Sequence, residues 1–304
     1  MNRVIKIGTR DSQLALWQAH TVQEKLQALG YSTKIITVKS TGDLTQDTPL
    51  YELGITGIFT KTLDTAMLNN TIDIAVHSLK DVPTALPKGI LQGAVLNRAS
   101  TQDILVTKQP VDLSKPCTIA TGSLRRKAQW LHQYPNHTVV NIRGNVNTRL
   151  QKLQDNPWQG AIFAKAGLER IKLLPENYTS LEWMTPAPAQ GAMVVVGLQN
   201  DLFCMQAIEK LNHVPSQIST QVERDFLRTL EGGCTAPIGA LAKIQEDTIQ
   251  FTGSLLSLDG SKKIDIEKVI PLHLAEKAGE NMAKELLKKG GDAVLKKIKQ
   301  TMNI

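Results

Sequence analysis

Ile72-Asp73-Ile74-Ala75-Val76-His77-Ser78-Leu79-Lys80-Asp81-Val82-Pro83 is the stretch of sequence that decides the fold class. Residues 72–76 are a short apolar run typical of a buried strand, and polar or capping side chains follow it at once. In open α/β sheets, ligands bind at the edge where the strands end. Asp81 is therefore a candidate functional carboxylate. A helix cap or a surface ion pair with Lys80 is an equally good interpretation.

Basic side chains follow strands in the same way three more times in the middle of the chain. Strand-like runs at 118–120, 139–142 and 161–164 lead into turns that carry Arg125 and Arg126, then Arg143 and Arg149, then Lys165 and Arg170. Ser123 is a predicted N-cap, so two arginines occupy the first helical turn after it. Positive charge is unfavourable there, and a bound anion would compensate it. Since guanidinium groups pair with carboxylates and phosphates, the pattern predicts α/β units that bind a small polyanion.

The composition indicates a soluble protein of two or three domains. Its 304 residues are 41% apolar and 21% charged, and no apolar run approaches the length of a membrane span. No apolar signal-peptide core follows Met1, so we expect a cytoplasmic protein without a membrane partner. The net charge of +7 accompanies lysines at helical spacing near the C-terminus, and aromatic residues are only 4%. A solvated helix face explains these lysines better than nucleic-acid binding does.

A lone thiol lies on a glycine turn late in the chain, in Leu230-Glu231-Gly232-Gly233-Cys234-Thr235-Ala236-Pro237-Ile238-Gly239. The two glycines clear space beside the sulfur, which would let a bulky group reach it. An inert cysteine after an ordinary helix C-terminal turn is the alternative. The three cysteines are far apart in the sequence, so we expect reduced thiols, no disulfide framework and no metal site.

Three further segments organise the chain. The polar, glycine-bearing stretch 40–57 is too long for a minimal connection, which predicts either a lid or a disordered loop. Residues 186–191 have the composition of a hinge, and the apolar strand at 193–198 is able to return to the first sheet. Strands near 238–244, 248–257 and 263–270, followed by lysine-rich helices, predict a small α+β domain.

Five ordered motifs run from one end of the chain to the other. They are Arg10-Asp11-Ser12-Gln13-Leu14-Ala15-Leu16-Trp17-Gln18-Ala19, Ala75-Val76-His77-Ser78-Leu79-Lys80-Asp81-Val82-Pro83, Thr121-Gly122-Ser123-Leu124-Arg125-Arg126, Arg143-Gly144-Asn145-Val146-Asn147-Thr148-Arg149-Leu150 and Glu231-Gly232-Gly233-Cys234. Together they resemble the porphobilinogen deaminase (hydroxymethylbilane synthase) family. The resemblance implies two α/β domains similar to type II periplasmic binding proteins, joined by a hinge, and a small C-terminal α+β domain. The expected domains are 1–97 with 193–214, then 98–192, then 215–304.

The resemblance also implies an activity and a set of site residues. A monomeric enzyme of tetrapyrrole (haem) biosynthesis would join four porphobilinogen molecules head to tail, lose ammonia each time and release hydroxymethylbilane by hydrolysis. A dipyrromethane cofactor would be attached to Cys234 and contact Lys80, Asp81, Ser123, Arg125, Arg126 and Gly144. Substrate carboxylates would bind Arg10, Ser12, Arg143, Arg149, Arg170 and Lys61. Asp81 would lie by the pyrrole nitrogens, assist proton transfer and stabilise the cationic azafulvene.

Four positions depart from the family pattern. Thr56 replaces a lysine, Ala99 lies in a segment without its usual acidic and second basic residues, Ala189 replaces a glycine and Val196 replaces a glutamate. Cys234 and Asp81 are retained, so an active enzyme is expected. The four changes would mainly affect the stiffness of the hinge and the reaction rate. Two other functions are open. A polycarboxylate-binding protein would explain the arginines, but it leaves the Gly-Gly-Cys turn without a role and would usually carry an export signal. A nucleic-acid-binding protein would explain only the net charge.

Overall fold

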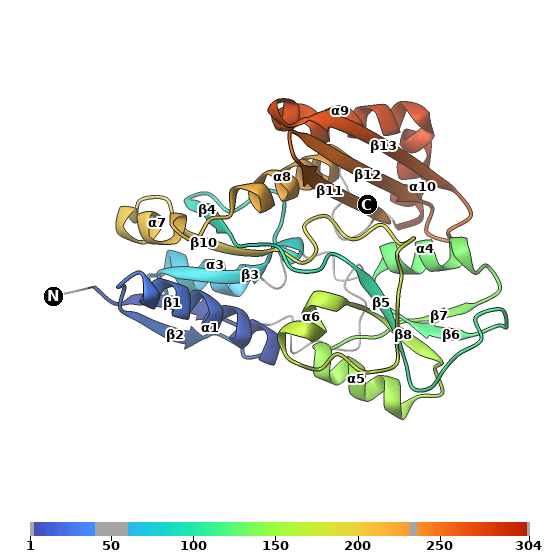
Figure 1. The fold of residues 1–304 in the computed structure, drawn as a ribbon, viewed down its shortest axis with the longest axis horizontal. Helices are drawn as coiled ribbons and strands as arrows, with labels where there is room; N and C mark the ends of the chain where they lie inside the picture. Colours follow the sequence, from blue (N-terminus) through green and yellow to red (C-terminus); the bar gives the residue numbers. More distant parts are fainter. Residues whose placement is uncertain (1–2, 40–59, 231–235, 303–304) are drawn as a thin grey trace.

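The computed structural model describes residues 3–39, 60–230 and 236–302. Figure 1 shows three bodies, each built on its own sheet and, in the order of the bar, coloured mainly blue to cyan, green, and orange to red. The expected lid at 40–57, with Thr56, and the expected anchor Cys234 lie outside the described residues. Among the residues described, no helix is both long and apolar enough to cross a membrane.

The first body contains a five-stranded sheet in the order β2-β1-β3-β10-β4. Its strands are β1 (Ile5–Thr9), β2 (Thr33–Thr37), β3 (Ile74–Ser78), β4 (Ile90–Val95) and β10 (Met193–Leu198). Helices α1 (Gln13–Ala28) and α7 (Leu202–Glu209) cover one face, and α3 (Lys61–Leu68) covers the other. The prediction that the late strand at 193–198 returns to this sheet is confirmed.

The strand at the centre of the opening motif ends two residues later than the sequence predicts. β3 runs to Ser78, so His77 and Ser78 belong to the strand. Lys80 and Asp81 lie in the short 3-10 turn η2 (Leu79–Asp81) that follows directly. The two candidate charges are therefore carried by a turn at the carboxyl end of a buried strand, as expected for an α/β ligand site.

The second body contains another five-stranded sheet, in the order β7-β6-β8-β5-β9. Its strands are β5 (Asp103–Thr107), β6 (Thr118–Ala120), β7 (Thr138–Val140), β8 (Gly160–Ala164) and β9 (Tyr178–Ser180). Helix α4 (Leu124–Gln133) packs on one face, and α5 (Val146–Asp155) and α6 (Lys165–Arg170) pack on the other. Each of these helices carries predicted basic residues, which are Arg125 and Arg126 on α4, Arg149 on α5, and Lys165 and Arg170 on α6.

The two five-stranded sheets share one topology. In each, three parallel strands are followed by one antiparallel strand, which is β10 beside β3 in the first sheet and β5 beside β8 in the second. Both antiparallel strands come directly after the chain crosses between the bodies, so the two crossing segments lie together. This repeated plan matches the two α/β domains that the family resemblance implies.

The third body is a three-stranded antiparallel sheet covered by helices, shown at the top of Figure 1. It comprises α8 (Val214–Thr229), β11 (Ile238–Gln245), β12 (Thr248–Leu256), β13 (Lys263–Pro271), α9 (Ala275–Leu286) and α10 (Asp292–Met302). Phe226 on α8 packs edge-to-face on Phe251 of β12 in its core. The α+β prediction and its three strands are confirmed.

The two crossing segments between the bodies touch at Gly191. Its carbonyl accepts a hydrogen bond from the Ala99 amide at 3.1 Å, and its φ of +85° lies in the left-handed region that favours glycine. A Cβ there would lie 2.5 Å from the carbonyl oxygen of Ser100. Ala189, where the family pattern has glycine, also has a positive φ of +62°, which costs an alanine roughly 1–2 kcal/mol. The expected hinge is therefore tightly packed and locally strained.

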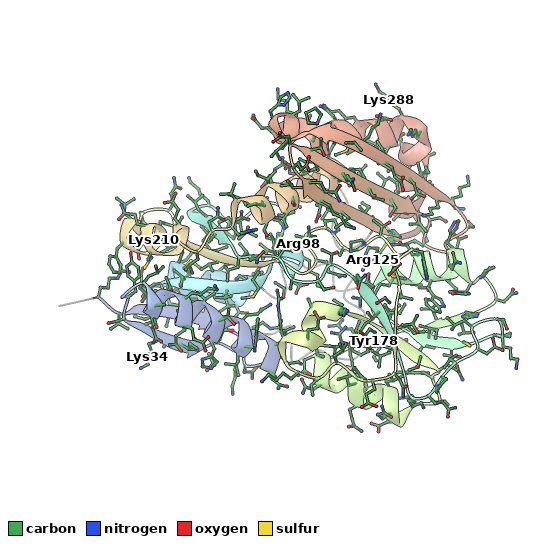
Figure 2. All side chains as sticks on the ribbon, viewed as in Figure 1. Lys34, Arg98, Arg125, Tyr178, Lys210 and Lys288 are labelled. Carbon is green, nitrogen blue, oxygen red and sulfur yellow. The ribbon has the colours of Figure 1, made fainter. Side chains whose placement is uncertain are left out.

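A buried carboxylate fixes the third body to this hinge. Glu223 on α8 forms a two-pronged ion pair with Arg98, at 2.7 and 2.9 Å, and also accepts hydrogen bonds from the amides of Ala189 and Ala242. The Glu223 side chain is fully buried. Figure 2 shows Arg98 near the centre of the molecule. The Glu223 carboxylate thus links residues of the hinge, of α8 and of β11.

We expect Glu223→Gln to destabilise the protein by about 3–5 kcal/mol, because it leaves the Arg98 guanidinium buried without its opposite charge. Guanidinium-induced unfolding of the purified variant measures this loss. Glu285→Gln, which alters an exposed carboxylate paired with Lys268 and Lys289, is the matched control and should leave the unfolding midpoint unchanged. Equal midpoints for the two variants would contradict the prediction.

Candidate active site

The turn after β3 presents Lys80 and Asp81 differently. Lys80 is half-buried, and its Nζ donates to Oε1 of Gln190 at 3.2 Å. Burial lowers the pKa of Lys80 to about 8, with Arg126 and Arg125 adding to the effect and Asp81 and Asp103 opposing it. Asp81 is exposed. Within the described ranges the two side chains form no ion pair with each other, so the surface-pair interpretation of Asp81 is not supported.

The two arginines at the start of α4 share one carboxylate. Asp103, the first residue of β5, forms an ion pair with each arginine: its Oδ2 lies 2.7 Å from Nη2 of Arg125, and its Oδ1 accepts a hydrogen bond from Nη2 of Arg126 at 2.7 Å. All three side chains are buried. Burial alone would raise the pKa of Asp103, but the nearby guanidiniums outweigh it and hold this pKa at about 2. Ser123 caps the helix as predicted, since its Oγ accepts from the Arg126 amide at 3.4 Å.

The helix-start charges are therefore partly compensated inside the protein. The sequence predicts a bound anion near Arg125 and Arg126, and the chain supplies one carboxylate, Asp103, for the two guanidiniums. Arg125 Nε is buried and has no hydrogen-bond partner among the described residues. Lys80 adds a further cation, because Gln190 bridges its ammonium to Asp103 through Nε2 at 2.9 Å. This cluster retains positive charge after all its internal pairs are counted.

The turn after β7 contributes two more cations. Arg143 is buried, and burial lowers its pKa. Gly144 has φ +113°, and a Cβ there would lie 2.6 Å from Cγ2 of Thr148, so this turn requires glycine. Arg149, on the first turns of α5, lies over the Phe163 ring at 5.3 Å. Burial and then Arg126 lower the pKa of Arg149 to about 10, while Asp81 acts in the opposite direction.

These electrostatic effects show which candidates the fold brings together. Asp81 influences both Lys80 on its own turn and Arg149 on the second body. Arg126 influences the same two cations. The turn after β3 therefore lies near the starts of α4 and α5, and Gln190 joins Lys80 of this turn to Asp103 of the second body.

Arg10 and Ser12 lie at the start of α1, on the same body as Asp81. Ser12 caps this helix, with its Oγ accepting from the Ala15 amide at 3.4 Å. Arg10 is half-buried and close enough to His77 to affect it. Burial, and then Arg10, lower the pKa of His77 to about 4, so this histidine is neutral at pH 7. Both predicted residues thus lie at the strand-end edge of the first sheet.

Two other predicted residues, Arg170 and Lys61, form no hydrogen bond or ion pair with this group among the described residues. Arg170 ends α6, donates to the Gly191 carbonyl at 2.7 Å and lies over the Trp17 ring at 5.5 Å. Burial lowers its pKa to about 10. Lys61 is the exposed first residue of α3. Cys234 lies outside the described residues. Arg170 is thus engaged with the hinge, and the roles of Lys61 and Cys234 stay predictions.

Sequence reasoning missed two residues on which the cation cluster depends. Asp103 stands directly before the apolar run Ile104-Leu105-Val106, and a carboxylate that enters a buried strand requires a partner, so this signal was present in the sequence. Gln190 carries no such signal. Its amide joins Lys80, Asp103 and the Thr101 carbonyl, all of which lie far from Gln190 in the sequence.

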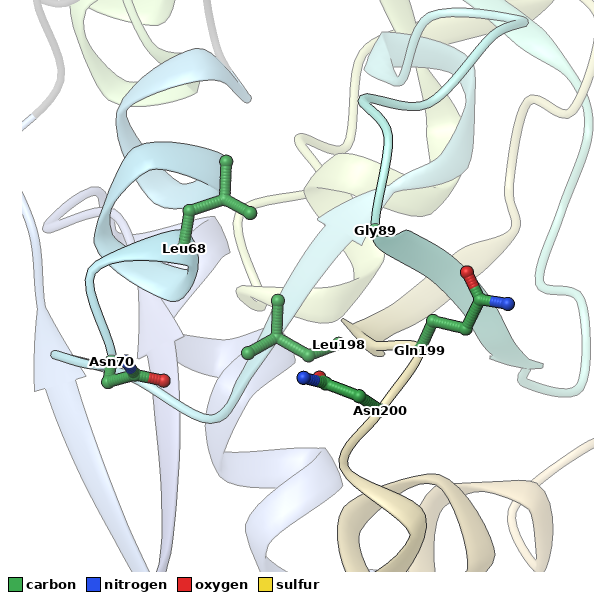
Figure 3. A pocket seen from close by; sticks show the side chains of 6 residues that line it. All are labelled: Leu68, Asn70, Gly89, Leu198, Gln199 and Asn200. Atoms are coloured by element: carbon green, nitrogen blue, oxygen red, sulfur yellow. The ribbon is translucent and has the colours of Figure 1, made fainter.

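An open hollow of about 570 Å³ lies elsewhere on the first body. Figure 3 shows its lining, which consists of Leu68, Asn70, Gly89, Leu198, Gln199 and Asn200. It carries no ionisable side chain. Leu198 ends β10, which runs antiparallel to β3, so the hollow is at the opposite end of the sheet from Asp81. The chemistry expected of the protein is therefore not supported there.

Two family models match the chain. The model described as porphobilinogen deaminase, dipyromethane cofactor binding domain, covers residues 5–206, and that described as porphobilinogen deaminase, C-terminal domain, covers residues 218–288. The chain belongs to the porphobilinogen deaminase family. It is accordingly an enzyme, a transferase of tetrapyrrole biosynthesis, and it contains the family's dipyrromethane-cofactor-binding domain.

Curated deaminases resemble the chain over nearly its whole length. The porphobilinogen deaminase of Campylobacter fetus subsp. fetus is 40% identical over 300 residues, covering 97% of this chain and 99% of the relative. That of Carboxydothermus hydrogenoformans is 37% identical over 310 residues, covering all of both chains. Among solved structures, the methionine-binding protein MetQ has a TM-score of 0.46 at 11% identity, covering 68% of this chain and 89% of that one. This last likeness is distant and adds nothing to the topology.

The residues present fit the deaminase cofactor, whose pyrrole rings carry carboxylate side chains. Arg125 Nε is a buried donor without a described partner, and a carboxylate is a suitable acceptor for it. The surplus of cations over carboxylates around Asp103 favours further anions. Gly144 keeps the turn beside Arg143 free of a side chain. The site thus suits a ligand with several carboxylates.

We expect Asp103→Asn to destabilise this deaminase by about 3–5 kcal/mol at neutral pH, because Arg125 and Arg126 would stay buried without their shared carboxylate. The folded-state pKa is about 2, below the unfolded value of about 3.9. The stabilisation by Asp103 is therefore present above pH 4 and disappears as the pH falls through 2. Unfolding free energies measured across this range should converge for wild type and variant.

Asp155→Asn is the control for this titration, since Asp155 is an exposed carboxylate on α5 outside the cluster. It should follow the wild-type stability at every pH. A difference between Asp103→Asn and wild type that stayed constant down to pH 2 would contradict the assigned role of the Asp103 charge.

Proposed function

We propose that this chain is a hydroxymethylbilane synthase. It condenses four porphobilinogen molecules head to tail with loss of ammonia and releases hydroxymethylbilane by hydrolysis. The observation that carries this proposal is the link from Lys80, beside the exposed Asp81, through Gln190 to the Asp103 carboxylate that holds Arg125 and Arg126, in a chain whose family is defined by this activity. These residues combine sites for many carboxylates with one carboxylate free to handle protons.

Charge explains the need for so many cations. Each porphobilinogen brings an acetate and a propionate, so every addition adds about two negative charges to the growing chain. Hydrogen bonds between charged groups contribute roughly 1.5–3 kcal/mol each, which offsets the cost of removing these carboxylates from water. The substrate carboxylates would be bound by Arg10, Ser12, Arg143, Arg149, Arg170 and Lys61.

A dipyrromethane cofactor would be held at the same edge. Cys234 would anchor it covalently, with Lys80, Asp81, Ser123, Arg125, Arg126 and Gly144 around it. When bound, it supplies the terminal pyrrole to which the first substrate is joined. Arg125 and Arg126, fixed by Asp103, would orient its carboxylates without side-chain rearrangement, which supports a preorganised site.

Asp81 would handle the proton that accompanies loss of ammonia. Its carboxylate is exposed, so a substrate amine or pyrrole nitrogen has access to it. It would assist proton transfer to the leaving amine and stabilise the positive charge that develops on the remaining fragment. Lys80 and Arg149 would meanwhile hold the substrate carboxylates beside it.

The cellular setting and domain bounds belong to the same proposal. The protein would act in the cytoplasm as a monomer, with porphobilinogen as its partner and without nucleic acid or membrane. Its domains would be 1–97 with 193–214, 98–192 and 215–304. The sheet order supports a discontinuous first domain, because β10 lies between β3 and β4.

Intact-protein mass spectrometry tests this function. We expect wild type to carry, or to gain from porphobilinogen, the mass of two pyrrole units, while Cys234→Ala stays at its bare sequence mass. Asp81→Asn should retain all or part of the cofactor and lose turnover. Cys117→Ala, which alters a buried free cysteine, is the control and should load cofactor normally.

A wild-type protein that stays at its bare mass and releases no ammonia from porphobilinogen would contradict the proposal. Binding of porphobilinogen without ammonia release would instead identify a polycarboxylate-binding protein. Loss of attachment in Cys117→Ala but not in Cys234→Ala would overturn the anchor assignment.

A further inference from the structure

Arg224 on α8 of the third body reaches the turn that carries Asp81 on the first body. Its Nη1 donates to the carbonyl of Leu79 at 3.2 Å and to that of Val82 at 2.9 Å. Its Nη2 donates to the carbonyl of Pro83 at 2.6 Å. Burial lowers the pKa of Arg224 to about 10, which leaves it charged at neutral pH. One guanidinium therefore holds three carbonyls of a single turn.

These carbonyls lie on both sides of Asp81 in the sequence. The same turn is held by two backbone bonds, from the Leu79 amide to the Ala192 carbonyl at 3.0 Å and from the Val82 amide to the Leu79 carbonyl at 3.2 Å. The Asp81 carboxylate itself has no hydrogen-bond donor among residues 3–39, 60–230 and 236–302. Arg224 therefore fixes the backbone from which the Asp81 side chain projects.

We propose that Arg224 is a positioning residue for the reaction, which aims the Asp81 carboxylate by fixing the turn from both sides. This inference rests on the proposed role of Asp81. Arg224 donates to backbone carbonyls and so acts through the turn, without contact with reacting atoms. A guanidinium suits this role because its planar fork serves several acceptors at once, which a lysine ammonium on a flexible stem does less well.

Helix α8, which carries Arg224, also contacts the hinge and comes shortly before the proposed cofactor anchor in the sequence. Glu223, the preceding residue, fixes the same helix to Arg98 and to the Ala189 amide at the hinge. The helix ends at Thr229, five residues before Cys234 in the sequence. One rigid element thus holds the Asp81 turn and leads toward the residue that would carry the cofactor.

Steady-state kinetics of the holoenzyme test the inference, after mass spectrometry has established cofactor loading. Arg224→Met removes the donors and keeps an apolar stem, and we expect it to lower kcat by about 10- to 100-fold with KM and loading within about twofold of wild type. Arg224→Lys should lose less. Arg228→Met is the matched control, because Arg228 is exposed one turn along the same helix and pairs only with Asp225 among the described residues.

Repeating the Arg224 substitution in an Asp81→Glu variant distinguishes positioning of the Asp81 carboxylate from a general structural effect of Arg224. Asp81→Glu keeps the carboxylate but moves it by one methylene, so in this background Arg224→Met should cost much less than it costs wild type. The same fold loss in both backgrounds, or activity equal to that of Arg228→Met, would overturn the inference. If Arg224→Met does not fold, Arg224→Lys provides the same comparison.

The two proposals fail in different ways. Loss of turnover in Asp81→Asn, together with wild-type kcat in Arg224→Met and Arg224→Lys, would overturn the inference and leave the proposed function standing. Full turnover by Asp81→Asn would overturn the inference together with the role proposed for Asp81, whereas the proposed function fails only if wild type releases no ammonia from porphobilinogen.

Discussion

Asp103 is a fully buried carboxylate whose two oxygens are divided between Arg125 and Arg126, and the site depends on this pairing. Two guanidiniums buried side by side repel each other, and neither could stay at the start of α4 without an opposite charge nearby. Asp103 supplies that charge from β5 and Gln190 extends the network to Lys80 on the first body. Cations from both sheets are thereby fixed before any ligand arrives, and they retain the excess positive charge that attracts one.

Glu223 plays the equivalent part at the hinge. Its carboxylate accepts from Arg98, Ala189 and Ala242, so every segment that meets there is tied to one buried group. The hinge accordingly has little freedom for local rearrangement, and it tolerates Ala189 in a backbone conformation that glycine adopts without strain. Glu223 thus joins the hinge to the third body through contacts at one buried side chain.

The sequence predicted those features that depend on interactions between residues close together in the chain. Hydrophobic periodicity predicts the strands that precede Asp81, Arg125 and Arg149, and it predicts the return of 193–198 to the first sheet. Capping chemistry predicts Ser12 and Ser123 as helix N-caps. The partners of these residues cannot be predicted in this way, because Asp103 meets Arg126 and Gln190 meets Lys80 across the fold. Arg170 shows the same limit: its place after a strand matched that of Arg125, yet it bonds Gly191 at the hinge.

The contacts made by α8 and the contact made by Lys80 differ in how many bonds must break if the bodies move apart while a chain of pyrroles grows. Consecutive residues of an α-helix point about 100° apart, which lets Glu223 reach the hinge while Arg224 reaches the Asp81 turn. Each makes several charge-assisted bonds, so α8, the hinge and the turn resist separation together. By contrast, Lys80 reaches the second body's network through one bond of 3.2 Å to Gln190. Separation of the first two bodies would break this bond and the bond from Asn147 of α5 to Gln13 of α1, and it would leave the Asp81 turn held to α8.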